Sequence, residues 1–229
     1  MVDVVVVRVF TDAAGAFGNH LGVVLDGASV DPEHRREVAT EVGYSATVFV
    51  DDAEKGDLRI FTPSVELPLA GHPLIGTAWV IERELGISLD TLRPPGGTVS
   101  TWTEQGLTWI NAPLASTPPW WHERLGSAAE VAALSGPQDP HQDATQIWGW
   151  EDEAAGFARA RVFAGRLGIV EDEACGSACM RLAAALGREL TVHHGQGSVV
   201  LARPGQAPGT ADVGGRVAVE PTRRVGLSG

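Results

Sequence analysis

The sequence predicts an α+β fold built from two related lobes, and three observations support this class. Short runs of β-branched and other apolar residues indicate roughly a dozen strands, whereas only four segments carry the start and stop signals of helices. The 28 Gly and 14 Pro residues among 229 suit many short strands joined by tight turns. A repeated succession of strand, loop, small residues and helix indicates a duplicated architecture.

The composition excludes several classes of function. A net charge of −12, spread along the chain, disfavours nucleic acid and anionic membranes as partners. No stretch approaches the ~20 apolar residues of a membrane span. The first ten residues, MVDVVVVRVF, are rich in valine and indicate a strand. They are not expected to be a secretory signal, which needs a longer apolar run after a basic region. With only two cysteines, a reducing cytoplasm is the expected location.

The expected N-terminal lobe covers residues 1–112 and is joined by a C-terminal strand, 215–222. Its helix after Asp31-Pro32 begins with an N-cap and a first-turn proline and ends at Gly43. The other expected elements are strands at 4–10, 23–25, 47–50 and 57–62, a loop at 15–22, and a hairpin formed by 98–103 and 107–111.

The expected C-terminal lobe covers residues 113–214, and its proline-rich start, 113–121, is the connection between the lobes. Ser127 and Glu130 have the spacing of a capping box for a short helix that reaches Leu134. The expected strands of this lobe are 146–150, 157–163, 190–192 and 199–202; a further strand, 217–219, lies in the C-terminal segment that joins the N-terminal lobe.

The repeat joins two stretches about a hundred residues apart. In the first, Arg59-Ile60-Phe61 leads to Ala70-Gly71-His72-Pro73 and a helix, 74–85, with Pro73 at its first position and Gly86 at its end. In the second, Arg161-Val162-Phe163 leads to Cys175-Gly176-Ser177 and an apolar helix that ends at Gly187. Each lobe would then direct one helix N-terminus at a shared groove.

Small residues where a loop enters a helix leave backbone N–H groups uncovered, and such a terminus binds carboxylates and oxyanions. Asp172, Cys175 and Ser177 all lie close to the second terminus. A purely structural interpretation remains open, in which Ser177 is an N-cap and Cys175 is a small buried apolar residue.

No metal site is expected. Cys175 and Cys179 lie four residues apart on one helix, too few for zinc and poorly placed for a disulfide. His193 and His194 end a strand without a third ligand nearby in the sequence.

Several motifs occur in one order between about residues 8 and 203: Phe17-Gly18-Asn19, Ser45-Ala46-Thr47-Val48-Phe49, Phe61-Thr62-Pro63, Glu66-Leu67-Pro68, Gly71-His72-Pro73, Gly76-Thr77-Ala78 and Glu171-Asp172-Glu173-Ala174-Cys175-Gly176-Ser177-Ala178. In this combination the sequence resembles the phenazine-biosynthesis isomerase family (PhzF-like). The resemblance implies the fold of diaminopimelate epimerase: two pseudo-symmetric lobes, each a curled, mostly antiparallel sheet around a central helix. It also implies a cofactor-free active site that moves a proton between carbons of a small carboxylate, and a homodimer.

The sequence departs from the family at the residue that carries the chemistry. In the resembled family a glutamate in a Ser-Glu-Thr segment is the acid/base, and this chain has Ala46 there, whose methyl group cannot transfer a proton. His20 replaces the usual proline after Gly-Asn, and Cys175 replaces the usual threonine before Gly-Ser. The groups that match the family are His72, Asp172, Gly176 and Ser177. A two-thiol racemase is not expected, because the partner thiol would fall near Ala70.

Three interpretations follow: an isomerase in which other residues move the proton, a variant inactivated by removal of the glutamate, and a catalytically silent protein that binds a small carboxylate or another chain. We favour the first, acting in secondary metabolism on a small cyclic or unsaturated acid. A cysteine at a helix N-terminus can have a lowered pKa, and histidine titrates near neutrality. The expected catalytic residues are His20, His72, Asp172, Cys175 and Ser177; the expected substrate-binding residues are Asn19, Ser45, Ala46, Gly71, Gly176 and Ala178.

Overall fold

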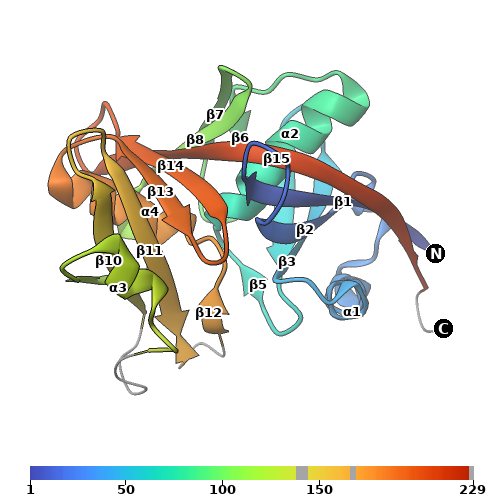
Figure 1. Cartoon of the computed structure of the whole chain (residues 1–229). Coiled ribbons are helices and arrows are strands. Elements are labelled where there is room, and N and C mark those ends of the chain that lie inside the picture. Colours follow the sequence, from blue (N-terminus) through green and yellow to red (C-terminus); the bar gives the residue numbers. More distant parts are fainter. Residues whose placement is uncertain (138–143, 166–168, 227–229) are drawn as a thin grey trace. The chain divides into compact units, whose positions relative to one another are not determined.

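The computed structural model of the chain describes residues 1–137, 144–165 and 169–226 (Figure 1). The chain forms two compact units. Unit 1 contains Met1–Val9, Asn19–Ile110 and the C-terminal segment from Arg216, and unit 2 contains Phe10–Gly18 and Asn111–Gly215. Among the described residues, none of the helices has the length and apolar character needed to cross a bilayer.

Helices are the smaller part of the structure, and strands the larger. The helices are η1 (Gly27–Ser29), α1 (Pro32–Val42), α2 (Gly71–Leu85), η2 (Leu114–Ser116), α3 (Ala128–Ala132) and α4 (Gly176–Leu186). The strands are β1 (Val2–Thr11), β2 (Asn19–Val24), β3 (Ala46–Asp52), β4 (Asp57–Phe61), β5 (Glu66–Leu67), β6 (Thr91–Leu92), β7 (Val99–Glu104), β8 (Leu107–Pro113), β9 (Trp121–Arg124), β10 (Thr145–Asp152), β11 (Phe157–Ala164), β12 (Ile169–Asp172), β13 (Leu190–His194), β14 (Ser198–Pro204) and β15 (Thr210–Val225).

The strands pair in one continuous order that passes through β15. It runs β5-β4-β3-β2-β1-β15 in the first sheet and β15-β14-β13-β11-β10-β9 in the second, so β15 belongs to both. In addition, β12 pairs with β11, β6 pairs with β7, and β8 pairs with β7 and β15. Most pairs are antiparallel, but β2 with β3, β9 with β10 and β11 with β13 are parallel. The predicted α+β class, with two lobes that each combine a sheet and a central helix, is confirmed.

The two units repeat one succession of elements. In unit 1 it is β2, α1, β3, β4, α2, and in unit 2 it is β9, α3, β10, β11, α4. The β3–β4 hairpin pairs Val50 with Leu58, the β10–β11 hairpin pairs Trp150 with Ala158, and both shift register at the next residue pair. The hairpins therefore correspond residue for residue.

This correspondence corrects the predicted alignment of the two repeats, which matched Arg59-Ile60-Phe61 with Arg161-Val162-Phe163. Phe49 pairs with Arg59 in one hairpin, and Gly149 pairs with Arg159 in the other, so Arg59 corresponds to Arg159. The predicted match of Arg59 with Arg161 is two residues out of register, because side-chain letters were aligned without the hairpin pairing that defines the repeat.

The central helices lie against their own sheets. Gly76 of α2 lies against β1 and β2: a Cβ there would come within 2.5 Å of Leu21 and 2.8 Å of Val9. Helix α4 packs against β13 and β14 (Figure 1). Gly176, at its start, would place a Cβ 3.1 Å from the ring of Phe10. Small residues on these helices therefore allow close approach to the sheet.

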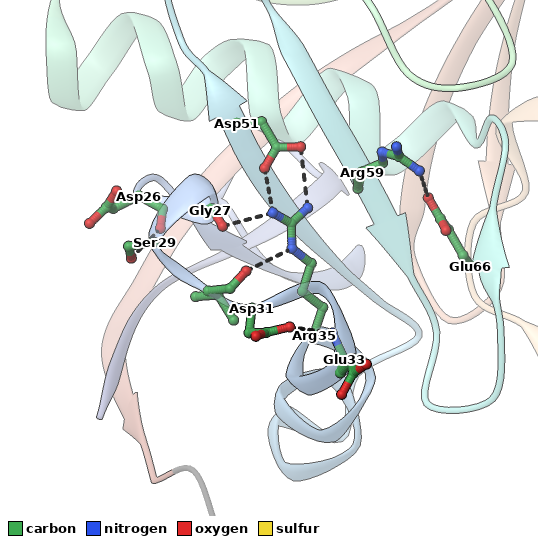
Figure 2. Close-up of polar contacts among 10 residues, drawn as sticks. Asp26, Gly27, Ser29, Asp31, Glu33, Arg35, Asp51, Arg59 and Glu66 are labelled. Atoms are coloured by element: carbon green, nitrogen blue, oxygen red, sulfur yellow. Dashed lines mark hydrogen bonds and ion pairs between the residues drawn. The ribbon is translucent and has the colours of Figure 1, made fainter.

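A buried arginine connects the loop before α1 to strand β3 (Figure 2). Arg35 donates to both carboxylate oxygens of Asp51, at 2.7 and 3.2 Å, and to the backbone carbonyls of Gly27 (2.9 Å) and Val30 (3.2 Å). The guanidinium also lies 5.4 Å from the centre of the Phe49 ring. With its donors used in this way, Arg35 stabilises the fold of unit 1.

Several element limits differ from prediction. Strand β2 begins at Asn19, inside the predicted loop, because residues 19–23 pair with β1. Helix α2 begins at Gly71, so Pro73 is its third residue, where the missing N–H still costs no intrahelical bond. Strand β9 (Trp121–Arg124) begins at the last residue of the predicted connection, 113–121. Strand β15 is far longer than the predicted strand 217–219 because both sheets supply partners for it.

Candidate functional site

The N-termini of the two central helices differ from those of the other α-helices. Helix α1 is capped by Asp31, which accepts from the Glu33 N–H at 3.0 Å, and α3 by Ser127, which accepts from the Glu130 N–H at 3.2 Å. The predicted N-cap role of Ser127 is thus confirmed. The Glu130 carboxylate accepts from the Gly126 N–H at 3.3 Å, one residue before the cap, and the helix ends at Ala132, before the predicted Leu134. Neither α2 nor α4 has a side-chain cap or an acidic residue in its first turn. No side chain therefore caps the first N–H groups of these two helices.

In unit 1 the start of α2 brings together the predicted histidine and serine. Gly71 and His72 are the first two residues of the helix and are half-buried. The His72 Nε2 atom lies 3.5 Å from the Ser45 hydroxyl oxygen, which also lies 3.4 Å from the backbone carbonyl of His20. Ser45 can therefore orient the His72 ring from the loop before β3.

His20 and Asn19 belong to the neighbouring strand, β2. The His20 ring stacks on Tyr44, with centroids 5.0 Å apart and planes at 17°. Asn19 pairs with Val9 of β1 and is half-buried. The structure thus places the His20 backbone beside Ser45, whereas the His20 ring is directed onto Tyr44.

Ala46 is the first residue of β3 and pairs with Leu21 of β2. Its exposed fraction is only 1%. The position therefore offers a buried methyl group next to Ser45, and no acid or base.

In unit 2 the loop before α4 holds the acid, thiol and hydroxyl predicted to act there. The Asp172 carboxylate is half-buried at the end of β12 and accepts from the Ala174 N–H at 3.2 Å. Cys175 is the N-cap residue of α4, so Ser177 is the second helical residue and not the cap. The Ser177 hydroxyl lies 3.6 Å from the Cys175 sulfur. Gly176 and Ala178, the other predicted residues, are buried in the first turn.

The expected lowering of the Cys175 pKa is wrong. Burial raises the pKa of this thiol well above its ordinary value, and the negative charge of Asp172 raises it further. Cys179 has a pKa raised to about 12, again chiefly by burial. Both cysteines are free, as the helix geometry predicted. Desolvation exceeds the effect of the helix N-terminus, so Cys175 remains a neutral thiol.

Two polar groups of this unit were not predicted as site residues. The Trp120 indole Nε1 donates to the Ser177 hydroxyl oxygen at 2.9 Å. The side chain of Glu173 accepts from the Ser198 hydroxyl at 2.7 Å and from the Gln196 N–H at 2.9 Å. Trp120 precedes Ser177 by 57 residues, so no local pattern could reveal their contact, whereas Glu173 was visible in the acidic run Glu171–Glu173.

His194 is a buried base close to the same loop. Its Nδ1 atom lies 3.0 Å from the Glu173 backbone carbonyl, while Nε2 is buried without a hydrogen-bond partner among the described residues. Burial lowers the pKa of His194 to about 4, and the charge of Asp172 opposes this shift. Among the described residues, no group of three His, Cys, Asp or Glu side chains is placed to hold a metal.

Solved structures of other proteins share this fold and show which classes of protein adopt it. A PhzF-family protein of Enterococcus faecalis has a TM-score of 0.80 at 19% identity and covers 99% of this chain and 100% of its own. A probable proline racemase of Agrobacterium radiobacter K84 has a TM-score of 0.61 at 12% identity and covers 100% of this chain and 94% of its own. The fold is therefore shared by PhzF-family proteins and racemases.

Sequence comparison identifies the family within this class. Residues 7–148 match the family described as "Phenazine biosynthesis-like protein" (PhzC-PhzF). The trans-2,3-dihydro-3-hydroxyanthranilate isomerases of Pseudomonas fluorescens and Pseudomonas aeruginosa are 30% and 31% identical to this chain, in each case over 78% of both chains. The chain belongs to the phenazine-biosynthesis-like (PhzC/PhzF) family, and the predicted recognition and isomerase class are confirmed at the level of that family.

Proposed function

We propose that this protein is a cofactor-independent isomerase that moves a proton between carbon atoms of a small carboxylic acid. The observation that carries this proposal is the pair of uncapped central helices, one starting with His72 and the other with Ser177, in a chain of an isomerase family. The helix N-termini would bind the carboxylate or the developing enolate through backbone N–H groups.

His72 is the proposed acid/base. Proton abstraction from carbon leaves an electron pair that delocalises toward the carboxylate, and return of the proton to another carbon shifts the double bond. His72 lies beside Ser45, which can fix its ring, whereas Ala46 offers no titrating group. Histidine suits this task because its ordinary pKa is near neutrality. His20 is the second candidate for the proton.

Asp172, Cys175 and Ser177 take supporting roles in the proposed reaction. Asp172 would orient the substrate, and Ser177 would donate to the carboxylate. Because burial keeps Cys175 protonated, we assign it no role as a thiolate. The substrate class is a small cyclic, unsaturated carboxylate, as in the relatives named for trans-2,3-dihydro-3-hydroxyanthranilate. The expected homodimer, cytoplasmic location and role in secondary metabolism belong to the same proposal.

The test is solvent deuterium exchange. Trans-2,3-dihydro-3-hydroxyanthranilate in D₂O should incorporate deuterium at carbon in the presence of the wild-type protein. His72→Asn should slow incorporation by about 100-fold or more, the typical contribution of a general acid/base. His34→Asn, on α1, is the matched control and should retain the wild-type rate. Full exchange by His72→Asn would refute the assignment of His72.

A silent binding protein is the second candidate function, and the buried methyl of Ala46 favours it. Such a protein would bind the same carboxylate without any exchange. Ala46→Glu separates the two candidates. If His72 is the base, this variant should show no gain, since the new carboxylate enters a position that is only 1% exposed. A large gain over an inactive wild type would support the silent or inactivated protein.

A further inference from the structure

We infer that Trp120 is a positioning residue that commits the Ser177 hydroxyl to hydrogen-bond donation toward an anionic guest. This inference rests on the proposed function, since it concerns recognition of the same carboxylate. It assigns a role to a side chain that lies outside the family motifs in this sequence, and it gives Cys175 a task that a neutral thiol can perform.

The direction of the Trp120–Ser177 hydrogen bond is fixed by chemistry. An indole N–H can only donate, whereas a serine hydroxyl has one hydrogen and two lone pairs. At 2.9 Å, Trp120 Nε1 therefore occupies a lone pair of Ser177 Oγ. The serine's own hydrogen is then left to point away from the indole, toward another acceptor.

Packing fixes the position of the indole. Trp120 packs against Val162, Cys175 and Ala178, which belong to β11, to the N-cap of α4 and to its first turn. Its backbone N–H also bonds to the Pro118 carbonyl at 2.9 Å. Because the Trp120 indole packs against the same helix turn that carries Ser177, its N–H stays aligned with the Ser177 hydroxyl.

The thiol of Cys175 completes the environment of the hydroxyl. Its sulfur lies 3.6 Å from Ser177 Oγ, and burial keeps it protonated. A neutral thiol is a weak donor and a weak acceptor. It can supply a second donor to Ser177 Oγ, or it can accept the serine hydrogen weakly until a stronger acceptor arrives. A carboxylate oxygen is that stronger acceptor, and bonds received by a hydroxyl strengthen the one that it donates.

The test is a double-mutant cycle read by binding and not by turnover. The probe is 4-fluorobenzoate, titrated into the full chain and followed by ¹⁹F NMR. Ser177→Ala should weaken binding by about 10- to 100-fold, as expected for a hydrogen bond to a charged group. Trp120→Phe keeps an aromatic ring, removes the N–H and should weaken binding by about 5-fold, since the hydroxyl can then turn away.

The decisive measurement is Trp120→Phe in the Ser177→Ala background. If Trp120 acts through Ser177, the second substitution should change affinity by less than about twofold, because coupled residues are non-additive. Equal losses in both backgrounds would show a packing role and overturn the inference. Trp121→Phe is the matched control, since this neighbouring side chain is 67% exposed, and it should leave binding unchanged.

The double-mutant cycle tests the role of Trp120, and the deuterium-exchange experiment tests the isomerase activity, so either can fail without the other. Coupled Trp120 and Ser177 with no deuterium incorporation would refute the isomerase and leave the inference standing. Additive effects in an active isomerase would refute the inference alone. If wild-type protein does not bind 4-fluorobenzoate, the recognition of an anion by Ser177 is wrong.

Discussion

The pH dependence of stability should be dominated by one buried base, His194. Its side chain is fully buried on β13, with Nδ1 3.0 Å from the Glu173 carbonyl. Desolvation lowers its pKa to about 4, against the opposing charges of Asp172 and Glu171, while Arg159 adds to the lowering. The folded protein therefore holds this ring neutral across the range in which an unfolded chain would protonate it.

The sign and size of the effect follow from linkage. The folded-state pKa lies below the unfolded value, near 6.5, so the unfolded chain binds the proton more tightly. Stability is complete above pH 6.5 and is lost as the pH falls toward 4. With a folded pKa of about 4, the loss between pH 7.5 and 5 is about 2 kcal/mol.

The assay is urea unfolding at pH 5 and 7.5, followed by tryptophan fluorescence. His194→Asn keeps a donor for the Glu173 carbonyl and removes the titrating group. Its stability should fall by about 2 kcal/mol less than that of the wild type over this range, or about 1 M in the urea midpoint. His34→Asn serves as the control and should follow the wild-type profile. Parallel pH profiles for wild type and His194→Asn would refute the reasoning.

Three further predictions concern stability and reactivity. Arg35→Ala should lower the free energy of unfolding by about 2–4 kcal/mol, because two backbone carbonyls and a carboxylate lose their donors. Removal of the exposed ion pair between Arg59 and Glu66, also drawn in Figure 2, should lower it by less than about 1 kcal/mol, and equal losses for the two variants in urea unfolding would contradict this account. Gly56→Ala should destabilise by more than about 1 kcal/mol in thermal unfolding, since φ is 73° and the new Cβ would lie 2.6 Å from a backbone carbonyl oxygen; an unchanged Tm would count against it. Cys175 and Cys179 should resist iodoacetamide at pH 8 in the native protein and react in urea, because burial raises both pKa values; rapid native alkylation detected by mass spectrometry would show that the thiols are accessible.

Features governed by neighbouring residues could be predicted from the sequence. Gly43, Gly86 and Gly187 end their helices in the left-handed conformation, as expected for glycine at those positions. Asp31 and Ser127 cap their helices through bonds that span only two or three residues. These signals depend on backbone sterics and short-range hydrogen bonds, which the order of residues specifies directly.

Features governed by pairing across the chain could not be predicted in this way. The sequence predicted a short strand at 217–219, whereas β15 covers Thr210–Val225 because it pairs with strands of both sheets. The repeat was real, but its register required the hairpin pairs that align Arg59 with Arg159. Strand length and register depend on partners that are distant in sequence, so residue type alone leaves them open.

For the candidate site, the sequence by itself determined which chemical groups stand at the start of each central helix: His72 after Gly71, and Ser177 after Gly176. It also determined that Ala46 contributes no acid or base. Only the tertiary structure decided the state of those groups. Burial keeps the Cys175 thiol protonated, and Trp120, from a distant segment, donates to Ser177. Solvation and long-range hydrogen bonds set protonation and orientation, and both arise only when the chain has folded.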